Sequence, residues 1–185
     1  MNRSAMQRFR IVPTMLRPFE AVAGMEASHV VPLVERLAAA NAVPRMAARN
    51  ALVALGKRAV PELIRSLSDH RPRVRWEAVK ILGLIADPAA ADAFVQALED
   101  DNDDVRWLAA MGLVALRRTA LRPLLRALEV RSSSWLLRDG AHHVCQGLAS
   151  KGFRDVVRPI LTALDAPMPE IATPVAAYRA LSKLR

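Results

Sequence analysis

The chain carries a ladder of apolar pairs, and the two members of each pair are four residues apart. The pairs are Leu33 and Leu37, Leu63 and Leu67, Phe94 and Leu98, Leu124 and Leu128, and Ile160 and Leu164, with successive pairs 30, 31, 30 and 36 residues apart. A spacing of four places both side chains on one face of an α-helix. The ladder therefore predicts five equivalent helices, each with one buried stripe.

A second set of apolar positions lies between these helices and predicts a first helix for each unit. Its marks are Ala47, Ala51 and Leu55, then Val74, Ala78, Leu82 and Ile85, then Val105, Ala109, Leu113 and Leu116. Turn residues separate the two sets, since Gly56 closes a first helix and Pro61, Pro123 and Pro159 lie near the starts of second helices. No segment alternates as a strand does. We expect an all-α chain of stacked helical hairpins.

One tripeptide repeats at the same period, because Val74-Arg75-Trp76 returns as Val105-Arg106-Trp107, 31 residues later. An Asp stands six residues before each Arg, as Asp69 and Asp100. This pattern, with Ala-rich first helices and Pro-bearing second helices, resembles HEAT repeats of the short, phycobilisome-lyase-like type over about residues 28 to 165.

The resemblance implies a right-handed α-solenoid of about five hairpins over residues 28–185, with a degenerate C-terminal cap. It also implies that Asp69, Arg75, Asp100 and Arg106 form a ladder of hydrogen bonds between adjacent units. Ser132 stands where the fourth unit should have its Asp, so we expect the least regular stacking there.

Residues 1–27 are expected to form a basic N-terminal arm or capping helix. Arg3, Arg8, Arg10 and Arg17 lie in the first 18 residues without an acid, a composition that also resembles an organelle transit peptide. Pro13 and Pro18 would break the amphipathic helix of such a peptide, which favours the arm or cap.

Composition sets further limits. With 52% apolar residues the chain can bury a core, and one cysteine, Cys145, excludes an internal disulfide and predicts a reducing, cytoplasmic location. The longest nearly unbroken apolar run, Trp107 to Leu116, is ten residues long, whereas a membrane span needs about 20. We expect Cys145 to be a small buried side chain and the chain to span no membrane.

The net charge of +9 is unevenly distributed. Lys and Arg outnumber Asp and Glu by 10 to 4 in residues 1–68, by 6 to 1 in 105–131 and by 7 to 4 in 132–185, whereas acids lead by 9 to 4 in 69–104. We interpret the acidic run Glu99–Asp104 as a solvated loop that caps a helix. If the second helices line a concave face, as in the family, Arg65, Arg122, Arg126 and Arg158 offer a basic, partner-binding groove; the alternative is an ordinary solvated face.

Two groups of side chains remain as candidate chemistry. Trp76 and Trp107 either pack between units or contact a partner or ligand. His142 and His143 follow Asp139 at i+3 and i+4, a pattern for which we expect a hydrogen-bonded structural role rather than a metal site or proton transfer. Because no nucleophile with a base, Gly-rich loop or metal-ligand cluster appears in the sequence, we expect no catalytic residue, metal or cofactor and no enzyme.

These patterns lead to one main functional hypothesis and two alternatives. The main one is a non-catalytic scaffold or adaptor that holds a protein partner of acidic or mixed charge along the concave face. The first alternative is a nucleic-acid-binding solenoid that uses the same basic groove. The second, implied by the family resemblance, is a bilin lyase-type subunit that acts with a partner chain.

Overall fold

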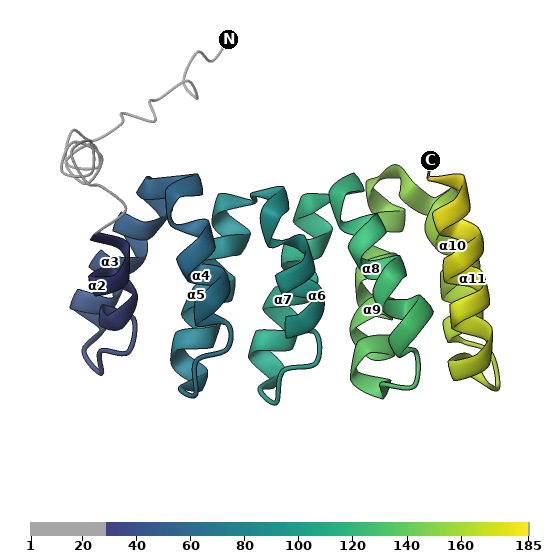
Figure 1. Ribbon diagram of the computed structural model, residues 1–185, viewed down its shortest axis with the longest axis horizontal. Helices are drawn as coiled ribbons and strands as arrows, with labels where there is room; N and C mark the ends of the chain where they lie inside the picture. Colours follow the sequence, from purple (N-terminus) through teal and green to yellow (C-terminus); the bar gives the residue numbers. More distant parts are fainter. Residues whose placement is uncertain (1–28, 185) are drawn as a thin grey trace, which may run out of the picture.

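The computed structural model describes residues 29–184, which form a row of antiparallel α-helices without a strand (Figure 1). The all-α solenoid predicted from the sequence is confirmed, whereas the predicted arm at 1–27 lies outside the described residues. No helix in 29–184 is long and apolar enough to cross a membrane. The helices are α2 (Val30–Arg36), α3 (Ala42–Leu55), α4 (Val60–Ser66), α5 (Pro72–Ile85), α6 (Ala91–Ala97), α7 (Asp103–Leu116), α8 (Arg118–Arg131), α9 (Trp135–Leu148), α10 (Arg154–Leu164) and α11 (Pro169–Lys183).

The first helices α3, α7 and α9 begin at polar residues that cap them. The side chains of Asn41, Asn102 and Ser134 accept hydrogen bonds from backbone amides at 2.9, 3.2 and 3.3 Å, which satisfies one of the free N–H groups at each helix start. These caps fix where the three helices begin, and the N-cap position of α5 is Arg71. Counting from them aligns the first helices of successive units residue by residue.

The ends of the first helices use left-handed backbone. Gly56 after α3 has φ 57° and ψ −129°, and Arg117 after α7 has nearly the same angles, φ 56° and ψ −122°. Only glycine adopts this conformation without strain, because it has no Cβ. Arg117 therefore stores backbone strain at a turn that continues directly into α8.

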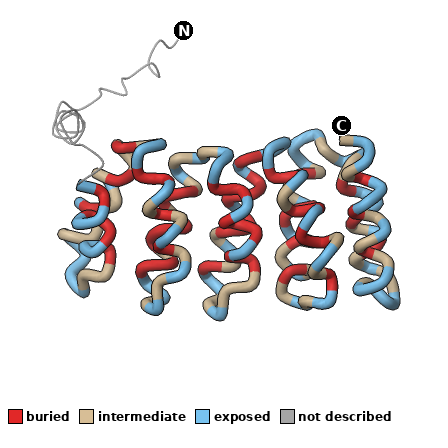
Figure 2. Tube along the Cα trace, in the orientation of Figure 1, coloured by how far each residue is buried: buried red, intermediate tan, exposed pale blue. Residues whose placement is uncertain are grey.

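The core runs through all units as one continuous apolar stripe, seen as the buried segments of each helix in Figure 2. Of the ten predicted pair members, only Leu67 and Leu164 are merely half-buried, and both still pack against this core. In α3 the buried residues are Ala48, Leu52 and Leu55, so the predicted marks Ala47 and Ala51 were one residue out of register. Gly112 of α7 lets the Phe94 ring approach, since a Cβ there would lie 2.6 Å from the Phe94 Cζ atom.

An arginine at the same position of each first helix secures the preceding turn. Arg45, Arg75, Arg106 and Arg138 each donate from Nη1 to the backbone carbonyl six residues earlier. Two of these arginines also reach the next unit. The Arg45 Nε atom lies 3.2 Å from Oε1 of Glu77 on α5. The Arg75 Nε atom lies 2.8 Å from Oδ2 of Asp100, and its Nη2 atom lies 3.0 Å from Oδ1.

The rest of the expected ladder takes other partners. Asp69 is held by Arg71 within its own turn, at 2.7 Å from Nη2. Arg106 pairs with Asp103 at i−3, because the next unit has Ser132 instead of an Asp. Among the four residues of the expected ladder, Arg75 and Asp100 therefore form the one side-chain pair that joins units, and the other bonds stay within turns.

The stacking changes at the C-terminal end. α10 packs against α9, while α11 lies along α8, where the regular pattern would place α10 (Figure 1). Pro174 has no N–H for the Glu170 carbonyl, and the Ser132 hydroxyl donates to that carbonyl at 3.0 Å. The expected irregularity at Ser132 thus has a physical reason: this side chain joins α8 to α11.

Candidate functional site

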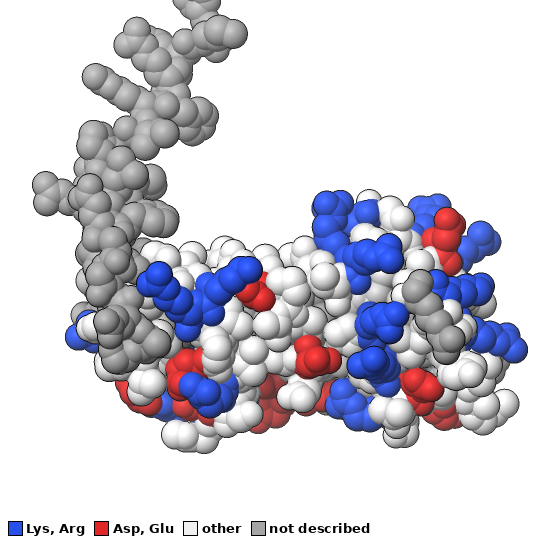
Figure 3. Space-filling view, turned by 45° about the horizontal axis from the view of Figure 1, so that its top comes forward, with Lys and Arg blue, Asp and Glu red and all other residues white. Residues whose placement is uncertain are grey.

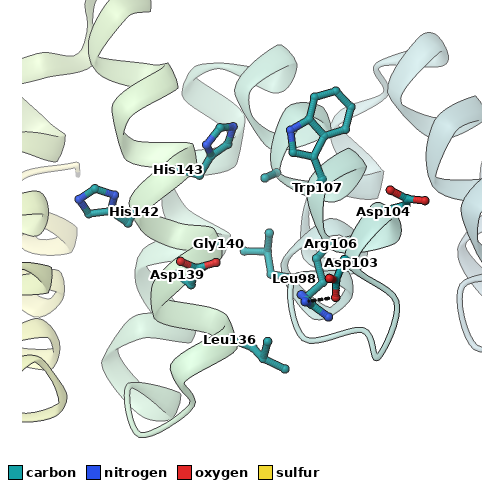
Figure 4. Close-up of a pocket in the computed structure, with 11 residues that line it drawn as sticks. Leu98, Asp103, Asp104, Arg106, Trp107, Leu136, Asp139, Gly140, His142 and His143 are labelled. Atoms are coloured by element: carbon teal, nitrogen blue, oxygen red, sulfur yellow. Dashed lines mark hydrogen bonds and ion pairs between the residues drawn. The ribbon is translucent and has the colours of Figure 1, made fainter.

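A groove of about 510 Å³ lies between the first helices α7 and α9 (Figure 4). The polar and aromatic side chains that line this α7–α9 groove are Asp103, Asp104, Arg106, Trp107, Asp139, His142 and His143, and its apolar lining includes Leu98 and Ala110. Its size falls within the roughly 300–1,000 Å³ that small-molecule sites occupy. The site is therefore large enough for an organic cofactor or substrate.

Trp107 is the most exposed aromatic side chain of the α7–α9 groove. It is 57% exposed and lies five residues after its N-cap, Asn102. Counting from the caps places Trp76 of α5 and Asp139 of α9 at the equivalent position. Because equivalent positions of stacked units line up, these side chains form a row along the first helices.

The two tryptophans have different surroundings. Trp76 is half-buried against the core, with the Lys80 Nζ atom 4.5 Å and the Arg49 Cζ atom 5.8 Å from its ring centroid. Met111 replaces Lys80 in the next unit, and within residues 29–184 no cation lies over the Trp107 ring. Trp76 thus packs between helices, whereas the face of Trp107 is free to contact a ligand.

A smaller groove of about 430 Å³ adjoins the first, and Asp104 lines both. This α3–α5 groove contains Arg45, Arg49 and Glu77, and the Glu77 side chain is only 1% exposed. Arg49 holds Glu77 with two hydrogen bonds of 2.7 and 2.6 Å, which raise the pKa of the Arg49 guanidinium. Because Arg49 and Arg45 neutralise Glu77, the charges of this groove that remain open are Arg73 and Asp104.

The carboxylates and histidines of the α7–α9 groove are arranged differently from the sequence expectation. Asp139 meets neither histidine, and the His142 Nε2 atom instead lies 3.1 Å from Asp165 at the end of α10. His143 is exposed and lies near Trp107 at one end of the groove (Figure 4). His142 thus links two helices, while Asp104, Asp139 and His143 face the groove.

The four arginines predicted to form a basic groove do not lie in one row. Arg65 pairs with Glu62 on its own helix, and Arg122 donates a hydrogen bond to the Leu184 carbonyl at 2.7 Å. The unit between them has Gln96 in place of an arginine. Arg126 and Arg158 are exposed, but α11 rather than α10 lies beside α8. These arginines line neither the α7–α9 nor the α3–α5 groove.

Cys145 is fully buried in α9, and this burial raises the pKa of its thiol to about 12. A thiol in this environment is not a nucleophile at neutral pH. Within residues 29–184 no group of three or more His, Cys, Asp or Glu side chains is placed to hold a metal ion. The side chains that line the α7–α9 groove can stack on a bound molecule and form hydrogen bonds with it.

Several known proteins are similar to this chain in sequence. Residues 30–114 match the family model of HEAT repeats. The chain is 34% identical over 129 residues to the phycocyanobilin lyase subunit beta of Nostoc sp. strain PCC 7120, covering 63% of this chain and 64% of that protein. It is 30% identical over 142 residues to the bilin biosynthesis protein RpcF of Synechococcus sp. strain WH8020, covering 71% of this chain and 68% of that protein.

These relatives overturn two of our expectations. One relative is a lyase subunit and the other a bilin biosynthesis protein. Similarity to them contradicts the main hypothesis of a non-catalytic scaffold, and it contradicts the expectation that the chain has no enzymatic function. The second alternative, a bilin lyase-type subunit, fits them better. The match in repeat type, over about two thirds of the length of each relative, agrees with the family indicated by the Asp and Arg pattern. The chain belongs to the phycobilisome-lyase-like HEAT-repeat proteins.

Proposed function

We propose that this chain is a bilin lyase-type subunit that binds a bilin in the α7–α9 groove and acts with a partner chain. The observation that carries the proposal is Trp107, a 57% exposed ring in a groove of about 510 Å³, in a chain similar to bilin-handling proteins. A large aromatic ring exposed to water is stabilised when a flat apolar surface covers it.

The chemistry of a bilin fits the side chains of the groove. A bilin is an open chain of four pyrrole-derived rings, with a conjugated face, several N–H donors and two propionate groups. Trp107 can stack on a ring, as aromatic side chains do on other flat conjugated ligands. Asp104 and Asp139 can accept hydrogen bonds from the ring N–H groups.

The propionates require cations, which the adjoining α3–α5 groove supplies. Arg73 lines that groove, is exposed and has no acidic partner among residues 29–184. A guanidinium binds a carboxylate with two parallel hydrogen bonds. A bilin that stacks on Trp107 and extends past Asp104 would bring a propionate toward Arg73.

A partner chain follows from the buried thiol. Attachment of a bilin to a cysteine would need an accessible thiolate, whereas Cys145 is buried with its pKa raised to about 12. In this proposal the reacting thiol belongs to the partner chain. His143, exposed beside Trp107, is placed to exchange a proton with the bound tetrapyrrole.

Titration of the purified chain with phycocyanobilin, followed by the visible absorbance and induced circular dichroism of the bilin, tests the proposal. Replacement of Trp107 with Ala should weaken binding by about fivefold or more, since stacking on an aromatic ring contributes roughly 1–3 kcal/mol. Trp135→Ala is the matched control, because Trp135 is 63% exposed on α9 and lies outside both grooves. Equal affinity of the two variants would contradict the assignment.

A further inference from the structure

The last two helices leave an apolar groove at the end of the solenoid. This α10–α11 groove has a volume of about 850 Å³ and is lined mainly by aliphatic side chains, among them Val156, Pro159, Ile171 and Val175. Ile171 is 61% exposed and Val175 is 49% exposed. Contiguous exposed apolar surface of this kind commonly marks an interaction site.

Elsewhere in the chain the corresponding place is filled by a helix. α7 packs on both α5 and α6, and α9 packs on both α7 and α8. The first helix of each unit thus lies in the groove between the two helices of the preceding hairpin. α10 and α11 pack against each other, and within residues 29–184 no later hairpin follows them. The α10–α11 groove is therefore shaped to receive one more helix.

Charge is concentrated at one end of this groove, where α10 begins and α11 ends. Arg154 and Arg158 on α10, Arg179 and Lys183 on α11 and Arg122 on α8 are exposed, against one acid, Asp155. None of the five cations has a carboxylate partner among residues 29–184. In Figure 3 the Lys and Arg side chains form a blue cluster at the α8–α11 end of the molecule, where red acidic side chains are fewer.

We propose that the α10–α11 groove docks an amphipathic helix of a partner protein whose acidic end lies over these cations. Residues 1–28 of this chain carry four Arg and two Glu and match the basic end poorly. A second copy is disfavoured because each chain has a net charge of +9. An acidic partner helix satisfies both the apolar groove and the unpaired cations. The proposal is independent of bilin binding.

A phage-displayed library of amphipathic helices, with the last turn varied among Glu, Gln and Lys, tests this proposal on the full chain. Selected helices should carry Glu in that turn, and Val175→Glu should weaken their binding by about tenfold or more. Lys183→Glu should weaken Glu-ended helices and strengthen Lys-ended ones. Val130→Glu, at a side chain that is 76% exposed on α8, should change affinity by less than about twofold.

Three results would overturn the proposal. In the first, no selected helix distinguishes the wild-type chain from Val175→Glu. In the second, binding is indifferent to the charge of the last turn. In the third, sedimentation shows a dimer of the wild-type chain that Val175→Glu dissociates, which would assign the groove to a second copy. Phycocyanobilin binding measured on the same variants should stay unchanged, so that failure of this proposal and failure of the proposed function are distinguishable.

Discussion

The ion pair between Arg75 and Asp100 is one of the buried charged links between successive units, and Asp100→Asn tests its contribution. Both side chains are nearly buried, with Arg75 9% and Asp100 8% exposed. Removing one partner of a buried pair costs about 3–5 kcal/mol, because the other charge stays buried. Asp101, which is 83% exposed, also contacts Arg75 and keeps part of the charge balance. We therefore expect a loss near the lower limit, about 3 kcal/mol.

The assay is urea unfolding followed by far-UV circular dichroism. With a slope of roughly 1–3 kcal/mol per molar urea, a loss of about 3 kcal/mol lowers the midpoint by about 1 M or more. Asp103→Asn is the matched control, because Asp103 pairs with Arg106 but is 88% exposed, and exposed pairs contribute about 0–1 kcal/mol.

A double-mutant cycle with Arg75→Met completes the test. If the pair acts as one unit, the double variant should lose much less stability than the sum of the two single losses, with a coupling of about 2 kcal/mol or more. A coupling below about 0.5 kcal/mol, or equal losses for Asp100→Asn and Asp103→Asn, would refute the assignment of this pair as a joint between units.

Three further predictions concern stability. Arg117→Gly should raise the unfolding free energy by about 1 kcal/mol in thermal melts, because it relieves positive-φ strain, whereas Gly56→Ala at the equivalent turn should lower it. Thr173→Val should also raise it, by about 1 kcal/mol, because the Thr173 hydroxyl is buried without a hydrogen-bond partner within the described residues. Hydrogen bonds from Arg71 lower the pKa of Asp69 from 3.8 to about 2, and the pKa of Asp100 is lowered because bonds from Arg75 and the Asn102 amide outweigh the opposing effect of burial. Both acids therefore stabilise the fold above pH 4, and acid titration should show that contribution disappearing as the pH falls from about 4 toward 2.

The sequence predicted the helices and the hairpins well, because the four-residue spacing of apolar pairs reflects burial directly. It could not predict the position of α11. α11 packs along α8, and this contact includes the hydrogen bond from Ser132 to the Glu170 carbonyl, whose residues are 38 positions apart. The Glu170 carbonyl lacks its usual partner within α11 because Pro174 has no N–H. In the sequence, a proline close to the start of a helix gives no sign of such a contact with another helix.

The candidate site was predicted only in part. The repeated tripeptide identified both tryptophans, but their different surroundings depend on the residue four positions later, which is Lys80 for Trp76 and Met111 for Trp107. The acidic run before α7 was interpreted as a capping loop, and Asn102 does cap that helix. Asp104 in addition lines both grooves, which only the spacing between neighbouring units reveals.

The central claim is that a bilin lies against Trp107, and site-resolved tryptophan fluorescence tests it most directly. The chain has three tryptophans, so the double variants Trp76→Phe with Trp135→Phe and Trp76→Phe with Trp107→Phe each retain one exposed indole. On titration with phycocyanobilin, the account predicts saturable quenching of Trp107 at low bilin concentration and much weaker quenching of Trp135. Equal quenching of the two indoles, or quenching of Trp135 alone, would contradict it.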